Sequence, residues 1–179
     1  MGVLLAGASS GAVEPAYQRS VEQYRVPEVV LVNQDGVAVP LRPYLQAADR
    51  LVVVEFIYAT CTTICPVLSA GFANLQRKLA PGTDRVRLVS ISIDPEHDTP
   101  REIKTYLERY QAQPGWDFLT GSRADIDSVM RAFAAWVPNK MAHFPLTLIH
   151  RPGAAEWVRI NGLTSTSELL GECRKAGLR

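Results

Sequence analysis

The feature that most constrains the fold is the apolar stretch LVVVEFIY at residues 51–58, which is followed after two residues by CTTICP at residues 61–66. Apart from Glu55, this stretch is apolar on both faces, a pattern typical of a strand buried in the middle of a covered sheet. Apolar residues at helical spacing over residues 66–80 predict a helix next. The two cysteines therefore fall between a strand end and a helix start, the edge of an open α/β sheet where ligands and chemistry collect.

The rest of the sequence predicts alternating strands and helices. After an irregular lead-in over residues 12–27, we expect a β-hairpin at 28–41, strands at 86–93 and 116–120, helices at 100–112 and 121–136, a second hairpin from 144–151 to 157–163, and a last helix at 165–177. Strands that alternate with helices and end in an antiparallel pair predict a mixed sheet with helices on both faces. The expected fold class is therefore α/β, a central mixed β-sheet flanked by helices, with an N-terminal β-hairpin.

The length of 179 residues fits one domain. We expect a single domain at residues 25–179, preceded by an N-terminal arm at residues 1–24. The opening MGVLLAGASSGAV is short, apolar and rich in small residues, with no basic residue before it. It is compatible either with the end of a secretory signal or membrane anchor, with AGA as a cleavage-like site, or with a plain arm, and we favour an exported protein.

Composition excludes several function classes. The net charge of +1 and the lack of a long basic run argue against a nucleic-acid surface. No apolar run reaches membrane-spanning length, so membrane association would depend on an anchor at the N-terminus. Three cysteines are too few for a disulfide scaffold, and the odd count leaves at least one thiol unpaired. We expect Cys173, near the end of the last helix, to pack in the core.

The cysteine pair at the predicted helix start, Cys61 and Cys65, is compatible with three kinds of site. A thiolate at a helix N-terminus is stabilised by free backbone N–H groups, which lowers its pKa. Positions i and i+4 of a helix lie on one face with Cα atoms roughly 6 Å apart, which permits a reversible disulfide. The same positions allow two thiolates to converge on one soft metal ion. An inert bridge, a redox pair and a metal site therefore all remain open.

A third ligand would distinguish a metal site from a redox pair. His97 lies in the polar loop DPEHDTP, where we expect a surface side chain, and His150 falls at the far end of its predicted strand. His143 precedes that strand, in a loop that we expect to pack beside the cysteines. Two thiolates and one imidazole suit copper, and zinc can use the same set. The residues alone leave His143 either as a ligand or as an ordinary loop histidine.

Three motifs, CTTICP, SISIDPEHDTP and MAHFPLTLIHRPG, resemble the Sco (SenC) proteins, and the resemblance covers roughly residues 25 to 175. It implies a thioredoxin-like fold and a copper ion held by Cys61, Cys65 and His143. It also implies assembly of the copper A centre of cytochrome c oxidase, with the copper A subunit or another thiol or copper protein as partner. The implied location is the periplasm or the outer face of the cytoplasmic membrane. Ala142 departs from the family, which usually carries Asp before this histidine.

Two further residues resemble features of thioredoxin itself. Glu55 lies six residues before Cys61, where thioredoxins carry a buried acid that moves protons. Burial of a carboxyl group raises its pKa towards a useful range. Pro145 falls where thioredoxin-like proteins place a cis-proline, which implies a role in docking a thiol or disulfide substrate. The alternative to a copper metallochaperone is therefore a thiol–disulfide oxidoreductase, in which Cys61 attacks, Cys65 resolves and Glu55 transfers the proton.

Overall fold

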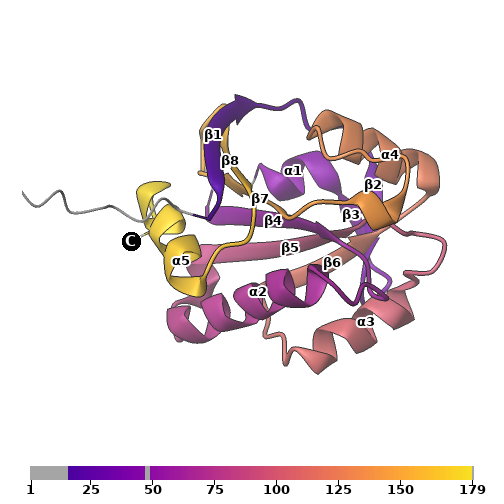
Figure 1. The fold of residues 1–179 in the computed structure, drawn as a ribbon, viewed down its shortest axis with the longest axis horizontal. Helices are drawn as coiled ribbons and strands as arrows, with labels where there is room; N and C mark the ends of the chain where they lie inside the picture. The colour runs from indigo at the N-terminus through magenta and orange to yellow at the C-terminus, as the bar shows by residue number, and fades with distance from the viewer. Residues whose placement is uncertain (1–15, 47–48, 179) are drawn as a thin grey trace, which may run out of the picture.

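The computed structural model describes residues 16–46 and 49–178, which form one eight-stranded sheet with helices on both faces (Figure 1). The strands are β1 (Gln18–Gln23), β2 (Val30–Asn33), β3 (Ala38–Pro40), β4 (Leu51–Ile57), β5 (Val86–Ser92), β6 (Trp116–Thr120), β7 (Leu146–His150) and β8 (Glu156–Asn161). The α-helices are α1 (Leu41–Leu45), α2 (Cys65–Leu79), α3 (Pro100–Arg109), α4 (Arg123–Ala132) and α5 (Thr166–Lys175), with 3₁₀ turns η1 (Thr83–Arg85) and η2 (Lys140–Ala142). The α/β class and the two predicted hairpins are confirmed.

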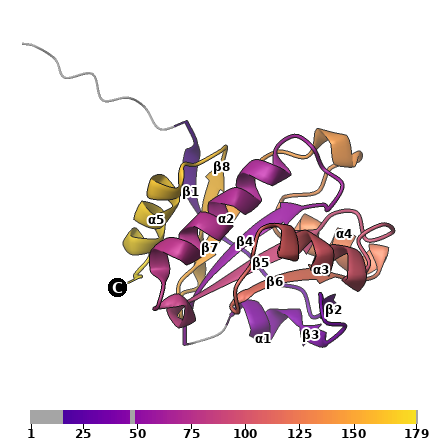
Figure 2. The same cartoon turned by 90° about the horizontal axis from the view of Figure 1, so that it is seen from below.

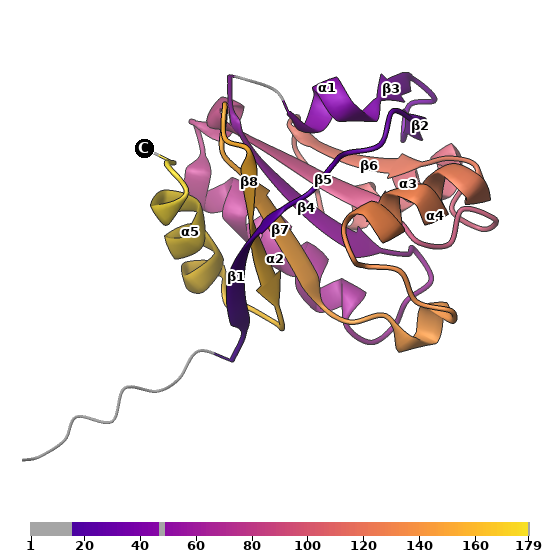
Figure 3. The same ribbon diagram turned by 90° about the horizontal axis from the view of Figure 1, so that it is seen from above.

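Strand β4 lies at the centre of the sheet, whose strand order is β1-β8-β7-β4-β5-β6-β2-β3. It pairs in parallel with β5 and antiparallel with β7. All seven residues of β4 are buried. Helices α2 and α3 cover one face of the sheet (Figure 2), and α1 and α4 cover the opposite face (Figure 3). The predicted buried central strand is therefore confirmed, because layers on both sides remove it from water.

Three helices begin with a side-chain cap. The side chains of Thr99, Ser122 and Ser165 each accept a hydrogen bond from the backbone N–H three residues further on, at the starts of α3, α4 and α5. Such caps stabilise a helix by about 1 kcal/mol each. Helix α2 begins differently, because its N-cap residue Ile64 makes no side-chain capping bond. Its first turn therefore offers backbone N–H groups to another acceptor.

The sequence interpretation was wrong at the beginning of the sheet. Residues 12–27 were expected to be irregular, yet β1 pairs antiparallel with β8 over residues 18–23. The strand was missed because its sequence QRSVEQ is polar and does not alternate clearly between apolar and polar residues. Such a composition is common in a half-exposed edge strand. The short helix α1 was also not anticipated. The expected signal or anchor falls on residues 1–15, which lie outside the described residues, and no helix within the described ranges combines the length and hydropathy needed to span a bilayer.

A buried carboxylate attaches β1 and its lead-in to the last helix. Glu172 in α5 accepts hydrogen bonds from Arg19 (2.7 Å), Tyr17 (2.9 Å) and Lys175 (2.6 Å). Burial alone would raise the pKa of the Glu172 carboxyl, but these bonds outweigh burial and lower it. Because two cations and one hydroxyl bind the carboxylate, Glu172 can remain ionised in the interior.

This arrangement predicts a pH-dependent contribution of Glu172 to stability. Glu172→Gln should lower the free energy of unfolding at pH 7 by about 1–3 kcal/mol, because two cations lose a buried charged partner. A lowered folded-state pKa means that the stabilisation is present above about pH 4.3 and is lost as the pH falls through the folded value. Urea unfolding at pH 7 and pH 3.5 measures both. The exposed Glu156, replaced by Gln, serves as the control and should change stability at neither pH; an equal loss for Glu172→Gln at both would contradict the prediction.

Candidate metal centre

The antiparallel pairing of β7 with β4 determines which histidine reaches the cysteines. At the carboxyl end of β4, the chain turns through residues 58–64 into α2, which begins at Cys65. In the β4–β7 ladder, Glu55 lies opposite Thr147 and Val52 lies opposite His150. The loop that enters β7 therefore arrives at the cysteine end of the sheet, whereas His150 lies at the other end. Both placements agree with the sequence analysis.

The three predicted donor atoms lie together. The Cys61 and Cys65 Sγ atoms and a ring nitrogen of His143 all lie within 4.8 Å of one another. The His143 Nε2 atom is 3.2 Å from Cys65 Sγ and 4.0 Å from Cys61 Sγ. Both thiols are buried and the imidazole is half-buried. Two sulfur donors and one nitrogen donor thus converge on a single point.

The backbone sets the orientation of the His143 ring. Its Nδ1–H donates to the Lys140 carbonyl at 2.7 Å, which leaves the Nε2 lone pair facing Cys65. Burial lowers the pKa of His143, and the hydrogen bond to the Lys140 carbonyl opposes this shift only in part. The ring of Tyr58 packs edge-on against the imidazole, with centroids 5.2 Å apart. A metal-ligating histidine is usually a neutral imidazole whose one N–H binds a backbone carbonyl or carboxylate, which leaves the other nitrogen free for the metal.

Cys61 is the more acidic of the two thiols. Burial alone would raise its pKa, but hydrogen bonds from the Cys65 thiol, the Thr63 hydroxyl and the backbone N–H groups of Thr63 and Cys65 lower the pKa to about 7. The Thr63 hydroxyl lies 3.6 Å from the sulfur. The Cys61 sulfur thereby occupies the place of the missing side-chain cap of α2. A large fraction of Cys61 is thiolate at neutral pH.

Cys65 has the opposite character. Burial, together with its hydrogen bond to Cys61, raises the pKa of this thiol far above its ordinary value. Its single proton serves the hydrogen bond to Cys61, while its sulfur also lies 3.2 Å from His143 Nε2. The pair therefore combines a thiolate with a thiol that retains its proton until a metal ion or a disulfide partner arrives.

Glu55 lies in β4, outside the cluster of donor atoms. Its Oε1 atom accepts hydrogen bonds from Ser90 (2.7 Å) and Ser69 (3.4 Å), and among the described residues its Oε2 atom has no partner. Burial raises the pKa of Glu55 to about 8, against the lowering effect of the two serine hydroxyls. Ser69 lies one helical turn beyond Cys65 in α2, and the negative charge of Glu55 is one cause of the high pKa of Cys65. The carboxyl is thus electrostatically linked to the cysteine pair.

The motif DPEHDTP supports the site from outside it. Asp98 accepts hydrogen bonds from the backbone N–H of Ala59 (3.1 Å) and the hydroxyl of Ser92 (2.6 Å), which attaches the cysteine loop to the end of β5. Asp94 accepts from the Lys140 ammonium at 2.5 Å, which attaches the histidine loop to the same motif. The sequence analysis quoted this motif as the polar loop around His97 and as part of the family pattern. It missed this bracing role, which depends on contacts between residues about 40 positions apart.

The other residues singled out by the sequence analysis lie away from the three donor atoms. Pro145 follows the histidine loop and is half-buried, but the cis peptide bond of the described residues is Ala80–Pro81, and Phe144–Pro145 is trans. His97 is exposed, as expected, and pairs with Asp94. Cys173 is buried in α5, also as expected. Within the described residues, these side chains lie outside the cluster of donor atoms.

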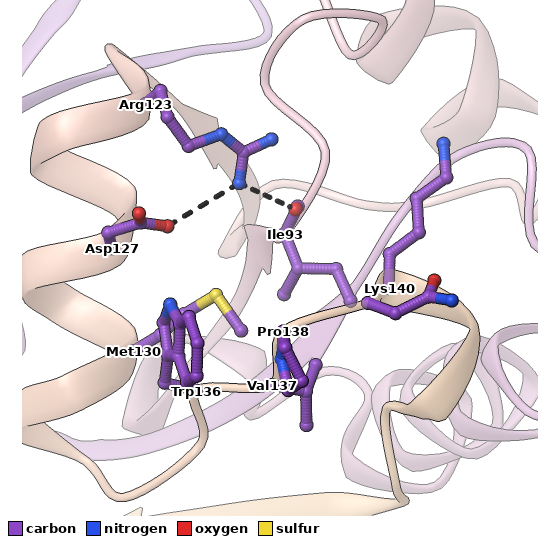
Figure 4. A pocket seen from close by; sticks show the side chains of 9 residues that line it. Ile93, Arg123, Asp127, Met130, Trp136, Val137, Pro138 and Lys140 are labelled. Atoms are coloured by element: carbon purple, nitrogen blue, oxygen red, sulfur yellow. Dashed lines mark hydrogen bonds and ion pairs between the residues drawn. The ribbon is translucent and has the colours of Figure 1, made fainter.

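Two pockets flank the site. One of about 320 Å³ is lined by residues 59–62 and by His97, Asp98, Glu102 and Arg109, and it gives access to the Cys61 side. The other, of about 510 Å³, lies between α4 and residues 136–140; there Arg123 binds Asp127 and the Ile93 carbonyl (Figure 4). The second pocket does not include the cysteines. The first is therefore the one through which a reagent can approach the Cys61 sulfur.

The contrast between the thiols predicts selective alkylation. Iodoacetamide should modify Cys61 with a midpoint near pH 7, because the thiolate is the reactive form. Cys65 and Cys173 should remain unmodified at that pH, because burial raises the pKa of both thiols. Mass spectrometry of alkylated peptides over a pH series measures this, with Cys61→Ser as the control that removes the modification. Earlier labelling of Cys65, or a Cys61 midpoint near the ordinary value of about 8.5, would contradict the assignment.

Comparisons with known proteins bear on the same residues. The family model SCO1/SenC matches residues 20–152. The SCO1 protein homolog of Bacillus subtilis (strain 168) is 36% identical over 117 residues, which are 64% of this chain and 59% of that protein. The chain spans about half the length of the curated relatives it matches.

Solved structures agree with these matches. BsSco, described as a Sco-family cytochrome c oxidase assembly protein with a disulfide switch, has a TM-score of 0.71 at 29% identity, covering 86% of this chain and 94% of that one. ScoI of Bradyrhizobium japonicum, solved with copper bound, has a TM-score of 0.65 at 24% identity, covering 82% and 96%. The second similarity shows a shared fold. Because the family model includes both cysteines and His143, and because the fold matches as well, this chain belongs to the SCO1/SenC family and has its thioredoxin-like fold.

Proposed function

We propose that this protein is a copper-binding metallochaperone in which Cys61, Cys65 and His143 hold one copper ion. The main support for this proposal is that the three donor atoms lie within 4.8 Å of one another, with His143 Nε2 facing the thiols. The ion is the cargo: the protein delivers it to the copper A site of cytochrome c oxidase, or prepares the cysteines of that site. Family membership supports this, since BsSco is described as a member of a cytochrome c oxidase assembly family.

The donor set fits Cu(I) in particular. Thiolate sulfur is a soft ligand that Cu(I) prefers, and an imidazole nitrogen helps retain Cu(II). The protein holds His143 neutral, keeps its ring in place through Lys140, and supplies one thiolate near neutral pH. Cys65 must release its proton when it binds metal, so copper affinity should rise with pH.

The same proposal includes a partner and a place. The partner is the copper A subunit of the oxidase, or another protein with thiol or copper ligands. The place is the periplasm or the outer face of the cytoplasmic membrane. Membrane attachment would come through residues at the N-terminus, ahead of the described domain. With a net charge of +1, the chain has no basic excess that would favour nucleic acid instead.

The copper proposal predicts a histidine-dependent affinity. Reduced, anaerobic protein should bind one Cu(I) per chain in competition with a coloured chelator. His143→Ala should weaken binding by about 10–100-fold or more, since even the supporting groups of a metal site contribute that much. His97→Ala is the matched control, because His97 is exposed and lies outside the cluster. Equal affinities for wild type and His143→Ala would reject the site.

A second candidate function is supported by the unequal thiols. If the protein is an oxidoreductase, the Cys61 thiolate would attack one sulfur of a substrate disulfide and release the other as a thiolate, leaving a mixed disulfide. Cys65 would then lose its proton and attack the Cys61 sulfur, which forms the Cys61–Cys65 disulfide and releases the second substrate sulfur as a thiolate. We propose Glu55 as the acceptor of the Cys65 proton, because its pKa of about 8 lies near neutral pH. The docking role expected for Pro145 assumed a cis peptide bond; because Phe144–Pro145 is trans, Pro145 is not part of this proposed mechanism.

The oxidoreductase proposal predicts separate effects on its two steps. Cys61→Ser should abolish reduction of a peptide disulfide. Glu55→Gln should leave the first attack unchanged and slow the release of the second thiol by about 100-fold, the lower range for loss of a general base. Rapid-quench analysis of the mixed disulfide separates the steps. Unchanged second-thiol release in Glu55→Gln would remove Glu55 from the mechanism, and disulfide reduction without histidine-dependent copper binding would favour this function over the first.

A further inference from the structure

Sulfur atoms are distributed unevenly between the interior and the surface. Among the described residues, Met141 is 67% exposed, whereas Cys61, Cys65, Cys173 and Met130 are at most 6% exposed. Met141 is therefore by far the most exposed sulfur donor of the described residues.

Met141 lies at the rim of the copper site. It belongs to η2, two residues before His143, and its Sδ atom accepts a hydrogen bond of 3.3 Å from the Tyr58 hydroxyl. The ring of Tyr58 packs against the imidazole of His143. Tyr58 thus links the exposed thioether to the imidazole of the cluster.

The side chain is held weakly and can move. A thioether is a weak hydrogen-bond acceptor, so the contact with Tyr58 positions Met141 without locking it. Methionine has three rotatable bonds and adapts to different neighbours. The adjacent Lys140 is paired with Asp94, so its positive charge is compensated at the position where a cation would approach.

The buried donors raise a kinetic problem that Met141 can solve. Cys61 and Cys65 lie almost out of contact with solvent. A thioether is a soft donor, which suits Cu(I). We propose that Met141 is a capture ligand, an exposed donor that binds Cu(I) first and transfers it to Cys61, Cys65 and His143; this inference rests on the copper function proposed above.

The transfer is a sequence of ligand exchanges without a redox step. The bond from Cu(I) to Met141 Sδ forms as a bond to the donor molecule breaks. The Cys61 thiolate and His143 Nε2 then bind the ion. Cys65 releases its proton to solvent as its sulfur binds, and the bond to Met141 breaks. Copper remains Cu(I) throughout, so no oxidant or reductant is required.

The test compares loading rates of the reduced full chain in stopped flow, with the Cu(I)–bicinchoninate complex as donor. Met141→Leu, a change of similar volume at an exposed position, should slow Cu(I) loading about tenfold, the lower end of losses at supporting positions of metal sites. The final stoichiometry of one Cu(I) per chain should be unchanged. Met130→Leu makes the same chemical change at a buried thioether and should load as fast as wild type.

Loading with Co(II), a harder ion, shows whether the effect comes from the sulfur. A capture role predicts that Met141→Leu leaves the Co(II) loading rate unchanged, because a thioether selects soft ions. Equal Cu(I) rates for wild type and Met141→Leu would overturn the inference while leaving the copper function intact. Equal slowing with both ions would overturn it in favour of an effect on loop shape. Failure of the wild type to take Cu(I) at all would remove the copper function and this inference together.

Discussion

The functional site depends on the antiparallel ladder between β4 and β7. This pairing sends the loop with His143 to the end of the sheet where β4 runs into Cys61 and Cys65. A parallel arrangement would have placed that loop at the opposite end, beside the position that His150 occupies. The shared edge of the sheet therefore brings together donors that are 78 and 82 positions apart along the chain. The rigidity of a fully buried central strand then holds one side of the site in place.

Burial shifts the pKa of each residue in the site, and the hydrogen bonds of that residue oppose or reinforce the shift. His143 is kept neutral, and Cys65 is kept protonated, because both charged forms lose water that the protein does not replace. Cys61 escapes this trend, since hydrogen bonds from the Cys65 thiol, the Thr63 hydroxyl and backbone N–H groups at the start of α2 replace the lost water. The result is a site prepared for metal or for disulfide exchange, with one reactive sulfur and one that reacts second. The same protonation states suit both proposed functions. The convergence of the three donor atoms favours the metal site.

Bracing residues give the site its precision. Asp98 holds the cysteine loop and Asp94 holds the histidine loop, and both belong to one motif after β5. Two flexible loops are thereby attached to a common support. Preorganisation of this kind reduces the entropy lost when ligands converge on an ion. Tyr58 adds a further connection, because it contacts both the His143 ring and the exposed Met141.

The sequence by itself determined most of the elements, because their signals are local: the apolar run of β4, the caps of α3, α4 and α5, and the cysteine spacing at the start of α2. It also singled out Cys61 and Cys65 as a pair on chemical grounds. Only the tertiary structure decided that His143 reaches them, that β1 completes the sheet, and that Asp94 and Asp98 brace the loops. These features depend on contacts between distant residues, and polar sequences such as QRSVEQ carry no hydrophobic pattern that reveals their partners. Distances and burial, which set the protonation states of the site, exist only once the chain has folded.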